Sequence, residues 1–218
     1  MQNLHALVLG ATGATGREIV NLLLNDDAYG KVSIFVRSKP RIKHKKLIIH
    51  EINFSKLNDY FSLVNGDVFF SAFGTTLKDA GNKAQQYLVD YTYQYEFARM
   101  ASENGIKHYL LVSSVGSNKN SPFFYSKIKG ALENAIIKLG FEKTYIFQPP
   151  FLIRQPDLIR PVEKKGLKAL KLFNQIGLLK SQRPLLVSDL AKKMIDVIKL
   201  DNVGVKIYKP TDIFSNTI

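Results

Sequence analysis

A tyrosine and a lysine four residues apart have the clearest chemical potential in this sequence. Tyr125 and Lys129 fall within 121–139, a stretch with helical composition that begins at Ser121-Pro122, so both side chains are expected on one face of a helix. An ammonium group about 4 Å from a phenol, at an effective dielectric constant of about 20, could lower the phenol's pKa by roughly 3 units from its usual value near 10. We therefore predict that Tyr125 exchanges a proton with a substrate near neutral pH and that Lys129 supports its charge.

A serine at the end of a neighbouring strand could complete this acid–base site. Residues 108–114 are predicted to form a strand that ends in Ser113-Ser114. If the helix packs against this strand, the Ser114 hydroxyl could hold the oxygen of the substrate. A tyrosine and a lysine at this spacing also occur by chance, as a buried aromatic side chain beside a surface lysine. In the predicted topology we prefer the catalytic interpretation, with Ser114, Tyr125 and Lys129 as the catalytic residues.

Three evenly spaced glycines, Gly10, Gly13 and Gly16, predict a phosphate-binding turn. They follow the apolar run 6–9 and precede the helical stretch 17–24. A helix N-terminus binds a diphosphate through its free N–H groups and its dipole only where no side chain blocks the approach. Glycines at these positions also permit the tight turn and the close packing of helix on strand. We therefore predict a dinucleotide-binding turn rather than a glycine-rich loop without function.

The residue at the end of the second predicted strand indicates which dinucleotide is bound. About 20 residues beyond the last glycine, a dinucleotide-binding fold places a residue beside the adenosine ribose. An acidic residue there binds the 2′-hydroxyl group of NAD and repels the extra phosphate of NADP. The sequence has Arg37 at this position, within a run that holds no carboxylate. We predict NADP(H) as the cofactor, with NAD(H) less favoured, and hydride transfer to a substrate that receives its proton from Tyr125.

These residues depend on an alternation of strands and helices that runs to residue 150. Predicted strands cover 5–9, 31–37, 47–54, 67–74, 108–114 and 143–148. Predicted helices cover 14–25, 55–64 with Ser55 as its cap, 84–104 and 121–139, and a loop is expected over 78–82. The alternation predicts an α/β fold, a doubly wound parallel sheet of the Rossmann type in three α/β/α layers. Gly74 ends the fourth strand, where a glycine lets a ligand approach the backbone.

The C-terminal part departs from this alternation and is expected to lie on the substrate side. The predicted elements are a basic helix over 163–174, a helix over 188–200 capped by Ser188, and a last strand over 205–208. Because ligands bind at the carboxyl ends of parallel strands, residues 151–183 are expected to form a wall or lid of the substrate pocket. We predict one domain over 1–218, with a dinucleotide-binding core over 1–150 and a small substrate-side region over 151–218.

The composition excludes several classes of site. The 218 residues include no cysteine, so neither disulfides nor thiolate metal sites can form. The four histidines lack metal-type spacing, and neither a Gly-x-Ser-x-Gly elbow nor a Gly-Lys-Ser/Thr loop occurs, so no metal site is predicted. No apolar run approaches the ~18–20 residues of a membrane span, and no basic region precedes the first apolar run. We therefore expect a soluble, cytoplasmic protein without a membrane partner.

The net charge of +13 is concentrated in two basic stretches, 37–46 and 154–183. Such stretches attract polyanions, including nucleic acid, an acidic protein or a phosphorylated ligand, and they could equally be a solvated basic surface. Direct nucleic-acid binding rests on charge alone and is the least favoured of these possibilities. The aromatic residues of the 84–104 helix are expected to make packing or homodimer contacts rather than a stacking platform for bases.

Together these motifs resemble the short-chain dehydrogenase/reductase superfamily, in its atypical, extended-like branch. The segments Leu57-Asn58-Asp59-Tyr60, Phe73-Gly74-Thr75-Thr76 and Tyr125 to Gly130 look more closely like the Tat-interacting-protein group of NADPH-binding oxidoreductase-like proteins. The resemblance covers essentially the whole chain. It implies cofactor contacts from Thr12, Gly13, Ala14, Thr15 and Gly16 at the diphosphate, Arg37 and Ser38 at the 2′-phosphate, Phe73 and Gly74 on the adenosine side, Lys129 at the nicotinamide ribose, and Pro149, Pro150 and Phe151 beside the nicotinamide. Asn53, Phe54 and Ser113 are also assigned to the cofactor site.

Two residues depart from the superfamily's pattern. Asn53 stands where an aspartate usually meets the adenine amino group, and its amide oxygen can still accept that hydrogen bond. Asp90 stands where enzymes of the branch commonly have an asparagine on the long helix, so an asparagine-based proton relay is not carried over. Two functions remain open: an NADPH-dependent reductase of a small carbonyl-type substrate, which we prefer, or a non-catalytic NADPH-sensing regulatory protein that binds a protein partner through residues 151–183.

Overall fold

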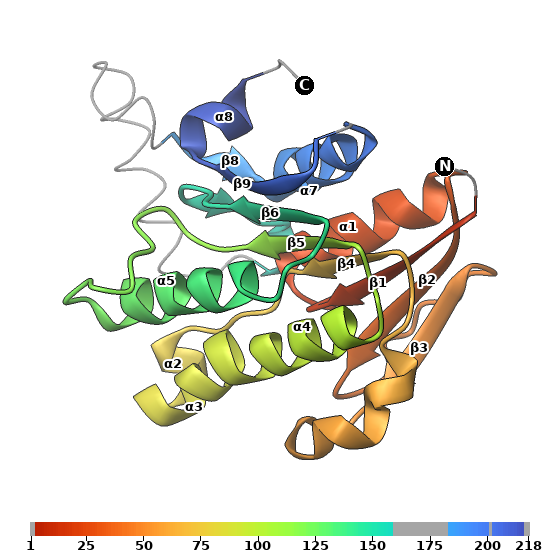
Figure 1. Cartoon of the computed structure of the whole chain (residues 1–218), viewed down its shortest axis with the longest axis horizontal. Coiled ribbons are helices and arrows are strands. Elements are labelled where there is room, and N and C mark those ends of the chain that lie inside the picture. The colour runs from red at the N-terminus through yellow and green to blue at the C-terminus, as the bar shows by residue number, and fades with distance from the viewer. Residues whose placement is uncertain (1–2, 159–182, 201, 216–218) are drawn as a thin grey trace.

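A parallel sheet of seven strands forms the centre of the protein in its computed structural model, which describes residues 3–158, 183–200 and 202–215. The strand order is β3-β2-β1-β4-β5-β6-β9, and every neighbouring pair is parallel (Figure 1). The strands are β1 (Leu4–Leu9), β2 (Tyr29–Val36), β3 (Leu47–Glu51), β4 (Val68–Ser71), β5 (His108–Val112), β6 (Lys143–Phe147) and β9 (Gly204–Tyr208). This confirms the predicted Rossmann-type sheet.

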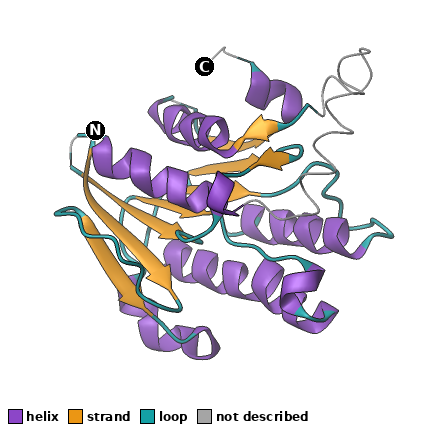
Figure 2. Cartoon of the chain, turned by 180° about the vertical axis from the view of Figure 1, so that it is seen from behind, coloured by secondary structure: helices purple, strands orange, loops and turns teal. Residues whose placement is uncertain are grey.

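Helices cover both faces of the sheet, which confirms the predicted three layers (Figures 1 and 2). On one face α1 and α7 pack against each other over an apolar cluster that includes Val8. On the other face α4 and α5 cover a second cluster that includes Leu9. Neighbouring residues of β1 supply different clusters because successive side chains of a strand point to opposite faces. The helices are α1 (Ala14–Asn25), α4 (Tyr93–Glu103), α5 (Phe124–Ile137) and α7 (Val187–Asp196).

The strand order reverses beside β1, and this reversal locates the candidate site. β1 pairs with β2 on one side and with β4 on the other, so the chain crosses β1 after it has built the edge strand β3. In open parallel sheets, ligands bind at the carboxyl ends of the strands where the order reverses. These ends are Leu9 of β1, directly before the glycine turn, and Ser71 of β4, directly before Phe73-Gly74.

The predicted 84–104 helix is continuous in path but consists of three segments. α3 (Lys83–Tyr87) leads into a single π-helical turn, η2 (Leu88–Thr92), and then into α4. Within the loop predicted over 78–82, the structure instead has the short helix α2 (Leu77–Ala80), because the Thr76 hydroxyl accepts a hydrogen bond from the backbone N–H of Asp79 at 3.2 Å. A π-helical turn is rare and often marks a functional position.

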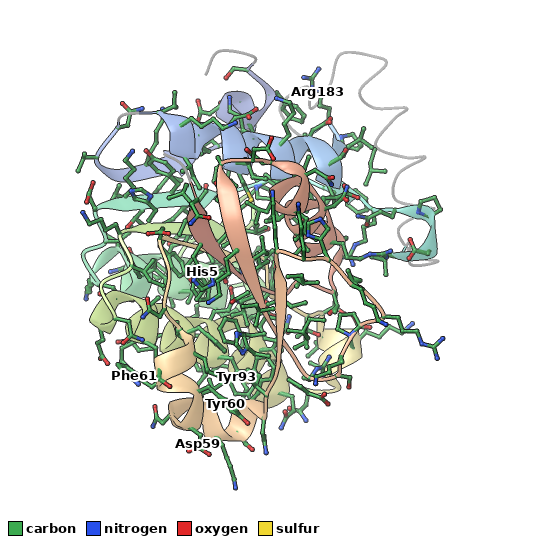
Figure 3. All side chains as sticks on the ribbon, turned by 90° about the vertical axis from the view of Figure 1, so that its right-hand side faces the viewer. His5, Asp59, Tyr60, Phe61, Tyr93 and Arg183 are labelled. Atoms are coloured by element: carbon green, nitrogen blue, oxygen red, sulfur yellow. The ribbon has the colours of Figure 1, made fainter. Side chains whose placement is uncertain are left out.

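The aromatic residues of this helix divide between the core and the surface. Phe97 is fully buried, and the ring of Tyr93 packs against Phe54. Tyr60 and Tyr93 both pack against the second cluster, and Figure 3 shows them at the end of the molecule away from Arg183. The three remaining tyrosines stack along the helix with ring centroids 4.9 Å and 6.0 Å apart: Tyr87, Tyr91 and Tyr95. Tyr87 is exposed, whereas Tyr91 and Tyr95 are half-buried against the second cluster.

Three predicted helix starts are wrong in detail. α5 begins at Phe124 rather than Ser121, because the Ser121 hydroxyl accepts a hydrogen bond from the N–H of Phe123 and holds that residue extended. Residues 54–63 form a 3-10 helix, η1 (Phe54–Leu63), whose cap is the Asn53 side chain rather than Ser55. α7 begins after Leu186 without a side-chain cap, so Ser188 lies inside the helix.

The C-terminal part adds to the main sheet as well as to the cleft side. β9 pairs with β6, which confirms the predicted last strand. A second, two-stranded parallel sheet joins β7 (Leu152–Ile153) to β8 (Leu185–Leu186) and was not predicted. Short helical segments complete this part: η3 (Pro156–Leu158), η5 (Val197–Lys199) and α8 (Pro210–Phe214). The helix predicted over 163–174 lies outside the described residues. Among the residues that are described, no helix has the length and apolar character needed to cross a membrane.

Candidate functional site

A cleft of about 550 Å³ opens at the carboxyl ends of β1, β4 and β5. It combines segments that are far apart in the sequence, from the glycine turn to the stretch after β7. The lining residues predicted from the sequence are Gly13, Ala14, Thr15, Phe73, Gly74, Ser113, Tyr125 and Lys129. The acid–base pair and the glycine turn therefore share one cavity of a size that suits a small-molecule ligand.

Backbone contacts explain two of the three glycines of the turn. Gly10 has φ +86°, and a Cβ there would lie 2.5 Å from the carbonyl oxygen of Ala72. A Cβ at Gly16 would lie 2.0 Å from the carbonyl oxygen of Gly10, so α1 can pack this closely on β1 only without a side chain. Gly13 differs, because its φ of −79° suits any residue and its Cβ would be 3.3 Å from the nearest atom. Gly13 instead faces the cleft.

The N-terminus of α1 offers open hydrogen-bond donors to this cleft. Gly13 is its N-cap, and no side chain caps the helix or places an acid in its first turn. The first N–H groups of a helix have no partner within it, and the dipole favours an anion there. Ala14 and Thr15 carry such groups and line the cleft, whereas Thr12 is exposed just before it. The turn therefore fits the diphosphate of a dinucleotide.

Tyr125 and Lys129 lie on the face of α5 that lines the cleft, but their surroundings differ. Lys129 is only 2% exposed, and its ammonium group donates a hydrogen bond to the carbonyl oxygen of Val112 at 3.2 Å. Tyr125 is 41% exposed. Ser114 follows β5, its hydroxyl donates a hydrogen bond to the carbonyl oxygen of Val115 at 3.3 Å, and it lies near enough to Tyr125 to lower the pKa of the phenol, although it is not among the residues that line the cleft. The three residues predicted to be catalytic are thus brought together at one end of β5.

The expected lowering of the phenol's pKa is not found. Burial raises the pKa of Tyr125 to about 12, and the negative charge of Asp90 raises it further, while Arg154 and the Ser114 side chain lower it. The charge of Lys129 is not among the influences on Tyr125. Burial also lowers the pKa of Lys129, against the opposing effect of Asp90 and Glu133. Tyr125 is accordingly a protonated donor at neutral pH rather than a base.

Ser113 is directed away from the cofactor position that the sequence suggested for its side chain. Its hydroxyl donates a hydrogen bond to the buried carboxylate of Glu133 and shares another with Ser117 at 3.0 Å. The amide of Gln148 donates to both oxygens of Glu133, at 3.1 Å and 3.0 Å. This network fixes the end of β5 against α5 and β6. Ser113 still contributes to the wall of the cleft.

The residues predicted for the adenosine side are arranged around β2 and η1. Arg37 and Ser38 are exposed directly after the carboxyl end of β2. The Asn53 side-chain oxygen accepts hydrogen bonds from the N–H and the hydroxyl of Ser55, at 3.0 Å and 2.6 Å. The amide oxygen of Asn53 is therefore occupied as a helix cap. Phe54 is buried and stacks on Phe73, with ring centroids 5.2 Å apart. Phe54 therefore helps to fix the orientation of the Phe73 ring.

The remaining predicted residues lie after β6. Pro149 and Pro150 are buried, and the carbonyl oxygen of Pro149 accepts a hydrogen bond from Val115. Phe151 is half-buried, and its carbonyl oxygen accepts a bond from Leu185 that begins the small sheet. None of the three lines the cleft among the described residues.

Several residues that line the cleft were not named as site residues in the sequence analysis. Leu152 and Arg154 fall within 151–183, the stretch that was expected to form a wall or lid of the pocket, although neither was singled out. Gln86 falls on the predicted long helix without a distinguishing pattern, and only the tertiary fold brings it to the cleft. The other lining residues that sequence reasoning missed are Ala72, Thr75, Thr76, Leu77, Lys83, Val112 and Phe124.

A reversed parallel sheet, a glycine turn at an uncapped helix and a cleft at the strand ends define a dinucleotide-binding protein of the Rossmann class. Sequence comparison agrees with this class, since the family model described as NAD(P)H-binding matches residues 10–171. The chain belongs to this NAD(P)H-binding, oxidoreductase-like family.

Curated relatives support the same family. The chain is 39% identical to the protein FMP52 of Candida albicans, named as mitochondrial, over 69% of this chain and 68% of that protein. It is 33% identical to the protein HTATIP2 of Rattus norvegicus, over 75% of this chain and 69% of that protein. The chain is a homologue of HTATIP2, which confirms the resemblance found from the motifs.

Solved structures share the fold at low sequence identity. A UDP-N-acetylglucosamine 4-epimerase from Methanobrevibacter ruminantium matches with a TM-score of 0.71 and 18% identity, over 96% of this chain and 77% of that chain. The enzyme WbmH of Bordetella bronchiseptica, in complex with NAD+, matches with a TM-score of 0.71 and 14% identity, over 95% and 76%. These likenesses concern the fold.

The comparisons correct one expectation. We expected a cytoplasmic protein, but several relatives carry names that assign them to mitochondria, among them those of Candida albicans and Aspergillus clavatus. The expectation is therefore wrong. It relied on the absence of a recognisable leader in the sequence, which is a weak guide to the compartment.

Proposed function

We propose that the protein is an NADPH-dependent oxidoreductase that reduces a small carbonyl-type substrate. The observation that carries this proposal is the shared cleft: Tyr125 and Lys129 line the same cavity as Gly13 and Thr15 of the glycine turn. A cofactor held at the turn would have its reactive end within the cavity where the proton donor lies. Membership of the NAD(P)H-binding family supports this assignment.

The chain's residues divide the work of the reaction. When bound, the cofactor supplies a hydride to the carbonyl carbon and is thereby oxidised. The Tyr125 hydroxyl supplies the proton to the carbonyl oxygen, so that the product is an alcohol, and the tyrosinate regains its proton from water at its exposed side. Ser114, which lies near enough to Tyr125 to lower its pKa, can hold the same oxygen. The buried ammonium group of Lys129 lines the same cavity, where it can bind the ribose next to the nicotinamide.

The preference for NADPH rests on the end of β2. Arg37 and Ser38 are exposed there, with no acidic residue in the following loop up to Lys46. A guanidinium group and a hydroxyl group can both bond the 2′-phosphate, and no carboxylate repels it.

The first experiment measures NADPH oxidation with a panel of small aldehydes and ketones. Tyr125→Phe removes only the hydroxyl that donates the proton, so turnover should fall at least about 100-fold while NADPH binding stays unchanged. Tyr87→Phe is the control, because Tyr87 is exposed, stacks on Tyr91 and does not line the cleft.

Two results would overturn this role. If Tyr125→Phe oxidised NADPH as fast as the wild type, the proton would come from another group. If NADPH bound but no carbonyl in the panel was reduced, the NADPH-sensing regulatory function would replace the reductase.

A further inference from the structure

A fully buried carboxylate with one unsatisfied oxygen lies behind the cleft. Asp90 is 0% exposed. One oxygen, Oδ1, accepts a hydrogen bond from the N–H of Thr75 at 3.3 Å, and the Gln86 side chain lies near enough to lower the pKa of the carboxyl group. The other oxygen, Oδ2, is buried and has no hydrogen-bond partner among the described residues. Burying such a group is costly, so its presence calls for a physical role.

The chain holds Asp90 in place through an unusual local structure. Asp90 sits in the π-helical turn η2, and the amide of Gln94 donates a hydrogen bond to its backbone carbonyl oxygen at 3.1 Å. The side-chain oxygen of Gln94 in turn accepts a bond from the hydroxyl of Ser71, at the end of β4, at 2.9 Å. Gln94 is fully buried. The π-helical turn is thereby anchored to the central sheet.

Asp90 lies directly behind the wall of the reaction cleft. A Cβ at Gly74 would lie 3.0 Å from its Oδ1. Three of its neighbours, Gly74, Thr75 and Gln86, line the cleft together with Tyr125 and Lys129. The carboxylate therefore approaches the cavity that contains the acid–base pair.

The titratable groups at or behind this cavity come from four parts of the chain. Lys83 is on α3, Asp90 is on η2, Tyr125, Lys129 and Glu133 are on α5, and Arg154 follows β7. Asp90 acts on both members of the acid–base pair, since it raises the pKa of Tyr125 and opposes the lowering of the pKa of Lys129. Burial raises the pKa of Asp90 itself, and Lys129 opposes this.

Glu133 provides a contrast within the same region. It is also buried, but hydrogen bonds from Ser113 and Gln148 satisfy its oxygens. It acts on Lys129 and is not among the groups that act on Tyr125. Of these two carboxylates, Asp90 is the one that affects the pKa values of both Tyr125 and Lys129.

We propose that Asp90 is a positioning residue that keeps the ammonium charge on Lys129 and the proton on Tyr125, so that the site favours proton donation over proton removal. This inference rests on the proposed reductase function. The reverse reaction, oxidation of an alcohol, needs Tyr125 as a tyrosinate base, and the negative charge of Asp90 disfavours that form. After each reduction, the tyrosinate beside Asp90 takes up a proton again from water at its exposed side. Asp90 thereby sets the pH range over which Tyr125 donates or removes a proton, and the equilibrium between carbonyl and alcohol is unchanged.

The test measures the ionisation of Tyr125 without any substrate or cofactor. The protein is labelled with fluorotyrosine, and the fluorine NMR signal of position 125, identified by its loss in Tyr125→Phe, is followed against pH. In Asp90→Asn the midpoint of this titration should move to lower pH. The substitution is close in shape, and the amide oxygen can still accept the bond from Thr75, so folding should be retained, which a thermal melt checks.

Two matched variants separate an effect of charge from one of structure. Glu133→Gln removes a buried carboxylate that acts on Lys129 alone, so the Tyr125 midpoint should stay in place. Asp59→Asn removes an exposed carboxylate of η1 and should also leave it in place. An unchanged midpoint in Asp90→Asn, or an equal shift in Glu133→Gln, would overturn the proposal.

The outcome is independent of the proposed function itself. The titration uses the nucleotide-free protein, so failure of NADPH binding or of carbonyl reduction overturns the reductase and leaves this result standing. If a substrate is found, Asp90→Asn should also shift the pH profile of alcohol oxidation to lower pH, relative to the wild type.

Discussion

At the scale of single residues, the glycine turn separates residues that build the fold from those that admit the ligand. Gly10 and Gly16 are required by backbone atoms that a Cβ would strike at 2.5 Å and 2.0 Å. A Cβ at Gly13 would make a milder contact, 3.3 Å from the carbonyl oxygen of Gly10, and Gly13 faces the cleft. Within one motif, Gly10 and Gly16 are therefore needed for backbone packing and Gly13 for the approach of the ligand. Substitutions can distinguish these two requirements.

Gly16→Ala should destabilise the protein by roughly 1–3 kcal/mol or more, because the helix must move off the turn to accommodate the new methyl group. Gly13→Ala should change stability by less than about 1 kcal/mol but weaken NADPH binding, because the methyl group stands where the diphosphate approaches. Thermal unfolding and NADPH fluorescence titration measure the two effects. If Gly13→Ala bound NADPH as tightly as the wild type, the diphosphate would not bind at this turn.

Residue types alone predicted the acid–base pair but not its electrostatics. The spacing of Tyr125 and Lys129 indicated a shared helix face, and both line the cleft. The pKa of Tyr125 moves upward rather than downward, because burial and Asp90 act on the phenol and the ammonium group is engaged by the Val112 carbonyl group. These influences come from η2 and β5, whose positions no local pattern specifies.

At the scale of elements, the segment after β7 connects the C-terminal part to the glycine turn. The amide of Gln155 donates hydrogen bonds to the carbonyl oxygen of Ala14 at 2.9 Å and to the carboxylate of Glu18 at 2.6 Å. Arg17 pairs with Asp157 at 2.5 Å on the exposed side. The same segment carries Leu152 and Arg154 into the cleft wall. A stretch distant in sequence thus closes one side of the nucleotide site.

Gln155→Ala should loosen this segment and speed the release of NADPH. Each hydrogen bond contributes about 0.5–1.5 kcal/mol net, so we expect roughly 2- to 10-fold faster dissociation, measured by stopped-flow fluorescence. Asn134→Ala is the matched control, since it removes a side-chain bond to the backbone of α5 at Gly130, outside the cleft. Equal rates in the wild type and Gln155→Ala would show that the segment has no part in holding the nucleotide.

The elements with strong periodic patterns were predicted well, and those set by tertiary contacts were not. The seven strands of the main sheet and helix α1 all lie where the apolar patterns indicated. The two-stranded sheet of β7 and β8 was missed, because each strand has two residues and is formed only by pairing across a long stretch of chain. The π-helical turn was missed for a similar reason: its residues fit a helical pattern, and only the packing of Gln94 and Asp90 reveals the irregularity.

At the scale of the whole molecule, the sheet brings the predicted cofactor residues to one edge. β1 supplies the glycine turn, β2 is followed by Arg37 and Ser38, and β4 is followed by Phe73 and Gly74. These strands are neighbours in the order β2-β1-β4. A nucleotide that lies across them would place its adenosine end near β2 and its reactive end near β5, where α5 carries Tyr125.

One of the two basic stretches lies next to the expected adenosine side of the cofactor site. The loop over 37–46 is exposed for most of its length and follows β2 at the adenosine side. Several of its basic residues could attract phosphate by general charge, whereas only Arg37 directly follows the strand end. Comparing Arg37 with Arg41, another exposed arginine of the loop, separates a specific contact from general attraction.

The measurement that tests the central claim most directly is a fluorescence titration with NADPH and NADH on the wild type, Arg37→Ala and Arg41→Ala, at about 0.15 M salt to screen distant charges. We predict tighter binding of NADPH than of NADH, a preference that falls roughly 10-fold or more in Arg37→Ala because a charge-assisted contact is lost, and no such change in Arg41→Ala. Failure of both nucleotides to bind, or a preference that Arg37→Ala leaves intact, would contradict the account.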